Sequence, residues 1–134
     1  MRWMLDTNTC IAVIRREPEQ ALKKLRGKSP GQVGVSSITL AELQFGVANS
    51  SRRLDAASAL SEFLLPLETA PFDAAVTSHY GLVRADLMRR GLPIGPLDML
   101  IAAHALSLDA VLVTHNVREF SRVKGLRVED WLKG

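Results

Sequence analysis

Apolar residues along this chain form two patterns, short continuous runs and longer stretches with helical spacing. The short runs predict strands at residues 3–5, 33–35, 67–69, 110–114 and 126–128. Between them, apolar side chains recur at intervals of three and four residues. This spacing predicts helices through residues 11–14, 18–27, 40–47, 54–64, 76–87 and 98–105. Strands that alternate with helices indicate an α/β fold with a central parallel sheet and helices on both faces.

Polar residues at the borders of these runs predict where helices begin. Asn8 or Thr9 is the expected cap of the first helix. Thr39 is followed three residues later by Glu42, which fits a capping box that would open the helix through residues 40–47. Asp73 is the expected cap of the long helix after it. No repeat, linker or low-complexity segment interrupts the pattern, so a single domain over residues 1–134 is expected.

Composition limits the cellular setting. The chain has 134 residues, 47% of them hydrophobic, which is enough for one sizeable core. No apolar run is long enough to cross a bilayer, and an acid at position 6 comes too early for a signal peptide. The single cysteine, Cys10, has no partner for an internal disulfide and excludes a cysteine-based zinc site. A cytoplasmic protein with no membrane association is expected.

Charge gives a weaker signal. Seventeen basic and 14 acidic residues leave a formal net charge of +3, which mildly favours polyanionic partners. The basic residues gather in two groups, and the simplest interpretation of each group is a solvated surface. They are Arg15, Arg16, Lys23, Lys24, Arg26 and Lys28 in the first group, and Arg118, Arg122, Lys124 and Arg127 in the second.

Three acids stand where an open parallel sheet binds its ligands, beyond the carboxyl ends of the strands. Asp6 closes the first predicted strand, and Glu42 and Asp98 are expected in the first turns of two helices. One such acid would most simply interact with the helix dipole. Three that converge repel one another unless a cation or a proton neutralises them. Oxygen ligands suit Mg²⁺ or Mn²⁺, which activate water and bind phosphates, so a phosphodiester is the expected substrate.

Polar residues after the 110–114 strand are weaker candidates for the same site. Thr114 and Asn116 leave the strand on that side and are expected to bond a metal-bound water or a carboxylate. Glu119 follows a few residues later and is within reach of the same place. His115 is well placed, but a single histidine proves little. The other two histidines, His79 and His104, are expected to be packing or surface residues.

Four blocks of this sequence resemble, in order and in spacing, the blocks of VapC toxins, a branch of the PIN-domain ribonucleases. They are MLDTN at 4–8, SSITLAELQFG at 36–46, GPLDMLIAAHA at 95–105 and LVTHNVREF at 112–120. The resemblance implies a PIN fold, Mg²⁺- or Mn²⁺-dependent endoribonuclease activity and a homodimer. It also implies inhibition by a small VapB-like antitoxin. Several VapC toxins act on structured RNAs such as tRNA.

Carried over to this chain, the resemblance makes Asp6 and Asp98 the principal metal-binding acids and Glu42 the third acid. Thr7 and Asn8 match polar neighbours that hold the first aspartate in place. Many PIN domains have a fourth acid, usually aspartate, after the strand at 110–114. This chain has Asn116 there and Glu119 nearby, which leaves open whether one or two metal ions bind. His115 stands where asparagine is common, and no role is assigned to it.

Other families with an aspartate after the first strand fit less well. A haloacid-dehalogenase-type phosphatase needs a second aspartate two positions on, where this chain has Asn8. A receiver domain needs an acid after the third strand, and that strand runs into Glu68-Thr69-Ala70. The remaining alternative is a PIN-like protein that binds RNA or a partner without cutting. The presence of all three acids argues against it, and a metal-dependent cleavage assay separates the two.

Inhibition by the antitoxin has an expected physical route. An Arg or Lys of the antitoxin would enter the acids at Asp6, Glu42 and Asp98 and offset their charge as the metal does. The helices between Pro18 and Leu64 would offer an apolar groove for the rest of the peptide.

Overall fold

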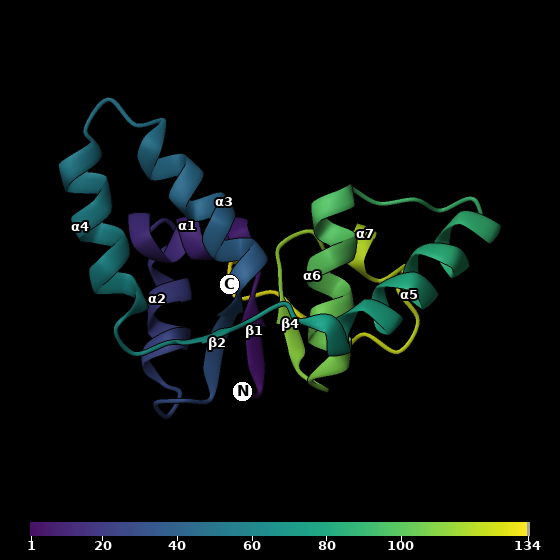
Figure 1. Ribbon diagram of the computed structural model, residues 1–134. Coiled ribbons are helices and arrows are strands. Elements are labelled where there is room, and N and C mark those ends of the chain that lie inside the picture. Colours follow the sequence, from purple (N-terminus) through teal and green to yellow (C-terminus); the bar gives the residue numbers. More distant parts are fainter. Residues whose placement is uncertain (134) are drawn as a thin grey trace.

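A five-stranded sheet, all parallel, forms the centre of the molecule (Figure 1). The computed structural model describes residues 1–133, and in these residues the strand order is β3-β2-β1-β4-β5. The strands are β1 (Trp3–Leu5), β2 (Val33–Ser36), β3 (Glu68–Ala70), β4 (Val111–Val113) and β5 (Val128–Glu129). Along the chain, β2 and β3 are added on one side of β1, and β4 and β5 are then added on its other side. The direction in which strands are added therefore reverses between β1 and β4. The carboxyl ends of these two strands are therefore the expected ligand-binding edge.

Helices cover both faces of the sheet, as the sequence predicts. They are α1 (Thr7–Arg15), α2 (Glu19–Arg26), α3 (Ser37–Ala48), α4 (Arg53–Leu64), α5 (Thr77–Arg89), α6 (Pro96–Ser107) and α7 (Val117–Phe120), with a 3₁₀ turn, η1 (Ala74–Val76), before α5. Figure 1 shows α1 to α4 on one side and α5 to α7 on the other.

Alternate residues of the central strands pack into two separate cores. Trp3 and Leu5 of β1 join the core under α1 and α4, whereas Met4 joins the core under α5 and α6. Because successive side chains of a strand point to opposite faces, a strand buried on both faces reads as a continuous apolar run. This explains why the central strands were visible in the sequence as uninterrupted apolar residues.

Two helix caps differ from the sequence prediction. Asp6, not Asn8 or Thr9, caps α1, and its side chain accepts a hydrogen bond from the Thr9 amide at 2.9 Å. Ser36 caps α3 through the Ile38 amide at 3.1 Å, so the predicted capping box at Thr39 is wrong. In both places the helix starts directly after the strand. The polar residue at the junction of strand and helix, Asp6 or Ser36, therefore becomes the cap.

The remaining differences lie at short elements. Asp73 does cap a helix, but through the Ala75 amide it caps η1 and not α5 itself. The edge strands β3 and β5 begin one and two residues later than predicted, respectively. Helix α7 has four residues and was not predicted, because so short a segment carries no apolar periodicity. None of the helices in the described residues is both long and apolar enough to span a membrane.

Candidate active site

Asp6 lies directly after β1 and is nearly buried, with 5% of its surface exposed. Its main chain is fixed to the next strand, because the Asp6 amide donates to the Val113 carbonyl at 3.0 Å. Thr9 also binds that carbonyl through its hydroxyl group, at 3.2 Å, while its amide holds the Asp6 carboxylate. Asp6 is thus held rigidly between β1 and β4, at the point where the strand order reverses.

Glu42 reaches this edge from α3. It lies in the second turn of that helix, not in the first as expected, because α3 begins at Ser37. The Thr7 hydroxyl group donates to Glu42 Oε1 at 2.7 Å and holds the carboxylate over the start of α1. The sequence resemblance assigned Thr7 and Asn8 to Asp6. The structure instead places the Thr7 hydroxyl on Glu42 and leaves Asn8 exposed.

Asp98 lies in the first turn of α6, as predicted, and is half-buried. The pKa of its carboxyl group is raised from the ordinary 3.8 to about 6. Burial is the largest cause, followed by the negative charges of Asp6, Glu119 and Glu42. Glycine at position 95 leaves room for this side chain, since a Cβ there would lie 3.3 Å from Asp98 Oδ2. Three carboxylates thus lie close enough to affect Asp98, and we call the four residues together the acidic cluster.

Glu119 joins the acidic cluster through the loop after β4. Thr114 is buried, and its hydroxyl oxygen accepts from the Asn116 amide at 3.0 Å. The Asn116 side chain donates to Glu119 Oε2 at 2.5 Å, which orients the carboxylate at the start of α7. The acid near Asp98 in this part of the chain is thus Glu119, and Asn116 is the residue that holds it. Because α7 was not predicted, the sequence did not show how close Glu119 comes.

The acidic cluster has the composition of a magnesium or manganese site without a closed cage. Within residues 1–133, no three His, Cys, Asp or Glu side chains are arranged to hold an ion by themselves. Mg²⁺ usually keeps several waters and binds through one or two carboxylates plus substrate phosphates, so it does not need such a cage. Burial and then the charges of Asp6, Glu119 and Glu42 raise the pKa of Asp98, and a cation bound among these carboxylates would offset their repulsion. A hard divalent cation fits both observations.

Two histidines belong to separate hydrogen-bonded pairs near this edge. His104 of α6 is buried, its Nδ1 lies 2.8 Å from Ser36 Oγ, and its ring packs edge-on against Phe72. Burial lowers the pKa of His104, although the Asp73 charge opposes the effect. This pair ties α6, which carries Asp98, to the start of α3. The interpretation of His104 as a packing residue is confirmed.

His115 is 66% exposed and pairs through Nδ1 with Asp130 Oδ2 at 3.0 Å. Sequence reasoning missed this pair, because Asp130 follows the shortest strand and has no motif around it.

Asp98 should make the stability of the metal-free protein depend on pH. Its pKa is higher in the folded state than the ordinary 3.8, so the folded state binds this proton more tightly. The resulting stabilisation is complete below about pH 4 and is lost as the pH rises through about 6. We expect the free energy of unfolding, measured with urea, to fall across this range. Asp98→Asn should flatten the slope, and the exposed Asp55→Asn should not.

A hollow with a volume of about 400 Å³ lies between α1, α2 and α4, and none of the acidic-cluster residues lines it. Its walls include Val13, Leu22, Leu25 and Phe63, and Arg16, Arg26 and Lys28 also line it. We call it the α1–α2–α4 groove.

Most of the second basic group makes contacts within the described residues. Lys124 pairs with Asp86 and Arg127 with Asp109, whereas Arg118, which precedes Glu119 on α7, is exposed.

Comparison with known proteins identifies the family. The PIN domain model matches residues 3–126. The "tRNA(fMet)-specific endonuclease VapC" of Shigella flexneri is 40% identical over 131 residues, which is 98% of each chain. "Ribonuclease VapC2" of Rickettsia felis is 42% identical over 134 residues, 99% of this chain and 100% of that one. The solved structure of VapBC2 from Rickettsia felis, bound to a promoter DNA fragment, matches with a TM-score of 0.92 and 41% identity over 98% of this chain and 99% of that one. The chain belongs to the PIN domain family and, within it, to the VapC ribonucleases.

Proposed function

We propose that this chain is the toxin of a toxin–antitoxin pair, an endoribonuclease that hydrolyses RNA phosphodiester bonds with the help of Mg²⁺ or Mn²⁺. The observation that carries the proposal is the acidic cluster at the carboxyl edge of the sheet, where burial and then the neighbouring negative charges raise the pKa of Asp98 to about 6. The 40% identity to VapC nucleases over nearly the whole chain supports the same activity. A non-cleaving RNA-binding protein would have no use for this concentration of charge.

Each acid has a role in this proposal. Asp6 and Asp98 hold the metal, with Glu42 as the third acid. When bound, the metal activates water and stabilises charge on the phosphate. Thr7 keeps Glu42 in place, and Asn116 keeps Glu119 in place. Thr7 and Asn116 each bind only one carboxylate oxygen of these glutamates. The other oxygen of Glu42 and of Glu119 accepts a hydrogen bond from the attacking water and orients it.

The substrate is proposed to be a tRNA, cut in a single-stranded loop. The relatives from Shigella flexneri and Salmonella typhimurium are both named tRNA(fMet)-specific endonucleases. A loop exposes its backbone and bases, whereas the bases of a paired stem are hidden in a narrow groove. The net charge of +3 favours a polyanion, as does the exposed Arg118, which precedes Glu119 on α7.

The proposal is tested by incubating the purified protein and Mn²⁺ with an initiator tRNA transcript. A parallel reaction uses the elongator tRNA for methionine. One dominant cut in a loop of the initiator tRNA is expected. Sequencing of the RNA ends locates it. Protein carrying Asp6→Asn, purified in parallel, controls for contaminating nuclease. Binding of the tRNA without any metal-dependent cut would favour the non-cleaving alternative.

The expected partner is a VapB-like antitoxin. The related structures from Rickettsia felis, Salmonella typhimurium and Haemophilus influenzae are VapBC assemblies. In this chain the α1–α2–α4 groove offers an apolar floor between basic side chains, which suits an amphipathic helix with acidic flanks. An Arg or Lys of the same peptide would enter the acidic cluster and compete with the metal. A homodimer and a cytoplasmic location, both expected from the sequence, stay predictions.

Co-expression with a cognate antitoxin should yield a stable complex in which RNA cleavage is suppressed. Leu22→Asp places a charge in the α1–α2–α4 groove and is expected to weaken the complex at least about tenfold, measured by calorimetry. The matched control is Leu108→Asp, which changes an exposed leucine outside the groove. Replacing the inserted basic residue of the antitoxin by Ala should restore cleavage. A complex that cuts RNA as fast as the free toxin would contradict this mechanism of inhibition.

A further inference from the structure

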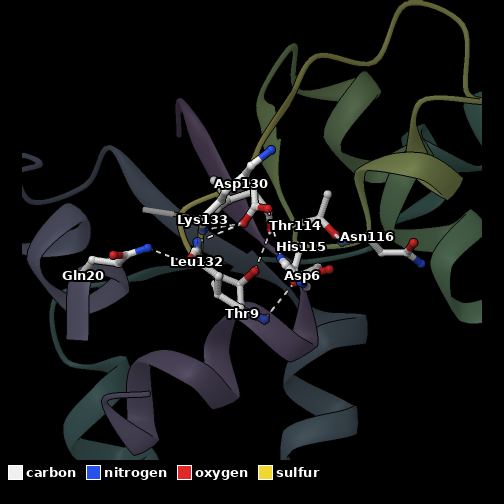
Figure 2. Close-up of polar contacts among 10 residues, drawn as sticks. Asp6, Thr9, Gln20, Thr114, His115, Asn116, Asp130, Leu132 and Lys133 are labelled. Atoms are coloured by element: carbon white, nitrogen blue, oxygen red, sulfur yellow. Dashed lines mark hydrogen bonds and ion pairs between the residues drawn. The ribbon is translucent and has the colours of Figure 1, made fainter. Parts of the chain in front are cut away.

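The pair formed by His115 and Asp130 stands at the carboxyl edge of the sheet, where Figure 2 shows it together with Asp6, one member of the acidic cluster. His115 follows Thr114 at the end of β4, and Asp130 follows β5, the neighbouring strand. The Asp6 amide binds the Val113 carbonyl, two residues before His115. In the chain, His115 therefore lies between Val113, which binds the Asp6 amide, and Asn116, which holds the Glu119 carboxylate.

The two oxygens of Asp130 have different partners. Oδ1 accepts from the amides of Leu132 and Lys133, at 2.9 and 3.3 Å, and Oδ2 accepts from His115. Partial burial raises the pKa of Asp130, but the hydrogen bonds from Leu132, His115 and Lys133 together with the His115 charge hold it below its ordinary value. An ionised carboxylate only accepts hydrogen bonds, so Nδ1 of His115 carries a hydrogen atom.

This arrangement decides what the exposed side of His115 offers. When His115 is protonated, both of its ring nitrogens donate. When it is neutral, Nδ1 carries the single hydrogen, so Nε2 has a free lone pair and acts as an acceptor. The side chain is 66% exposed, while the Asp130 side chain that orients it is only 14% exposed. The ring thus combines access to a ligand with a fixed orientation.

An acceptor at this place meets a need of the proposed reaction. A water molecule that attacks phosphorus makes no use of the ribose 2′-hydroxyl group, so the chemistry alone does not distinguish RNA from DNA. The 2′-hydroxyl is the hydrogen-bond donor that an RNA backbone has and a DNA backbone lacks. Resting on the proposed function, we propose that Nε2 of neutral His115, oriented by Asp130, accepts a hydrogen bond from the 2′-hydroxyl of a ribose flanking the scissile phosphate.

The test uses a short RNA that contains the cleaved tRNA loop, and variants of it with one 2′-deoxyribose at each position in turn. For the wild-type protein, deoxyribose at one position near the cut should lower kcat/KM about three- to tenfold, as expected for one neutral hydrogen bond. For His115→Asn, kcat/KM on the all-RNA substrate should already be reduced by that factor. The same deoxyribose should then have no further effect.

Three further variants separate the contact from a structural role. Asp130→Asn keeps the Oδ1 acceptor for Leu132 and Lys133 but presents an N–H to Nδ1, which moves the imidazole hydrogen to Nε2. Nε2 then donates instead of accepting, so kcat/KM on the all-RNA substrate should be lower than for the wild type. His115→Gln places an amide oxygen near the position of Nε2 and should restore part of the sensitivity to deoxyribose. His79→Asn, on α5, should match the wild type.

The outcomes separate this proposal from the proposed function. Cleavage of the RNA by the wild type, with sensitivity to the same deoxyribose retained in His115→Asn, overturns the role of His115 alone. Equal cleavage of all substrates by the wild type overturns it as well. No cleavage of any RNA by the wild type overturns the proposed function and this inference with it.

Discussion

Asp6→Asn and Asp98→Asn, made separately, are each expected to reduce RNA cleavage at least about a hundredfold. Each substitution keeps the shape of the side chain and removes one negative charge from the acidic cluster. A bound metal supplies several kcal/mol of transition-state stabilisation, and each 1.36 kcal/mol corresponds to a factor of ten in rate. Single-turnover cleavage of the initiator tRNA measures the effect. Asp55→Asn, which changes an exposed acid of α4, is the matched control.

The same two variants should remain folded. Asparagine is as good a helix cap as aspartate, so Asp6→Asn preserves the start of α1. Asp98→Asn should raise the thermal unfolding temperature of the metal-free protein above pH 6, because it removes a charge that the folded state disfavours. Full cleavage activity in either variant, in preparations free of other nucleases, would remove that acid from the proposed metal site.

Removal of divalent metal is expected to stop cleavage completely, and Mg²⁺ or Mn²⁺ should restore it. Ca²⁺ should restore little activity, because it takes more ligands in a looser geometry. Since a water molecule attacks phosphorus, the fragments should carry a 5′-phosphate and a 3′-hydroxyl group. Ligation and phosphatase treatment of the fragments identify these ends. A 2′,3′-cyclic phosphate would show that the 2′-hydroxyl attacks instead. Full activity in excess chelator would show that the acids do not act through a metal and have another role.

The fold was largely predictable because its signals are local. The central strands are buried on both faces and therefore appear as apolar runs, and the helices between them have regular spacing. The errors concern caps. Thr39 satisfied the capping-box pattern, yet Ser36 is the cap, because the helix begins at the strand end and Thr39 is buried within its first turn. The pattern alone does not contain that geometry.

The site was predictable only in part. The positions of Asp6, Glu42 and Asp98 at a strand end and at helix starts predict one common edge of a parallel sheet, and the structure brings their charges together. Their supporting contacts depend on pairs far apart in the chain, such as Thr7 with Glu42, 35 residues away. The pair of His104 and Ser36 spans 68 residues. No local pattern specifies such pairs, because they depend on how the helices pack in the tertiary structure.

Cys10 offers a way to observe the site without any RNA. It is the only cysteine of the chain, it is fully buried one turn after Asp6, and its amide binds the Asp6 carbonyl. Burial, followed by the Asp6 charge, raises the pKa of this thiol well above its ordinary value. A thiol reagent can therefore label Cys10 only when the start of α1 opens, and the labelling rate reports the free energy of that local opening. A metal ion held by Asp6 would have to dissociate before the start of α1 opens. The dissociation constant of the metal can therefore be determined from how far the metal slows the labelling of Cys10.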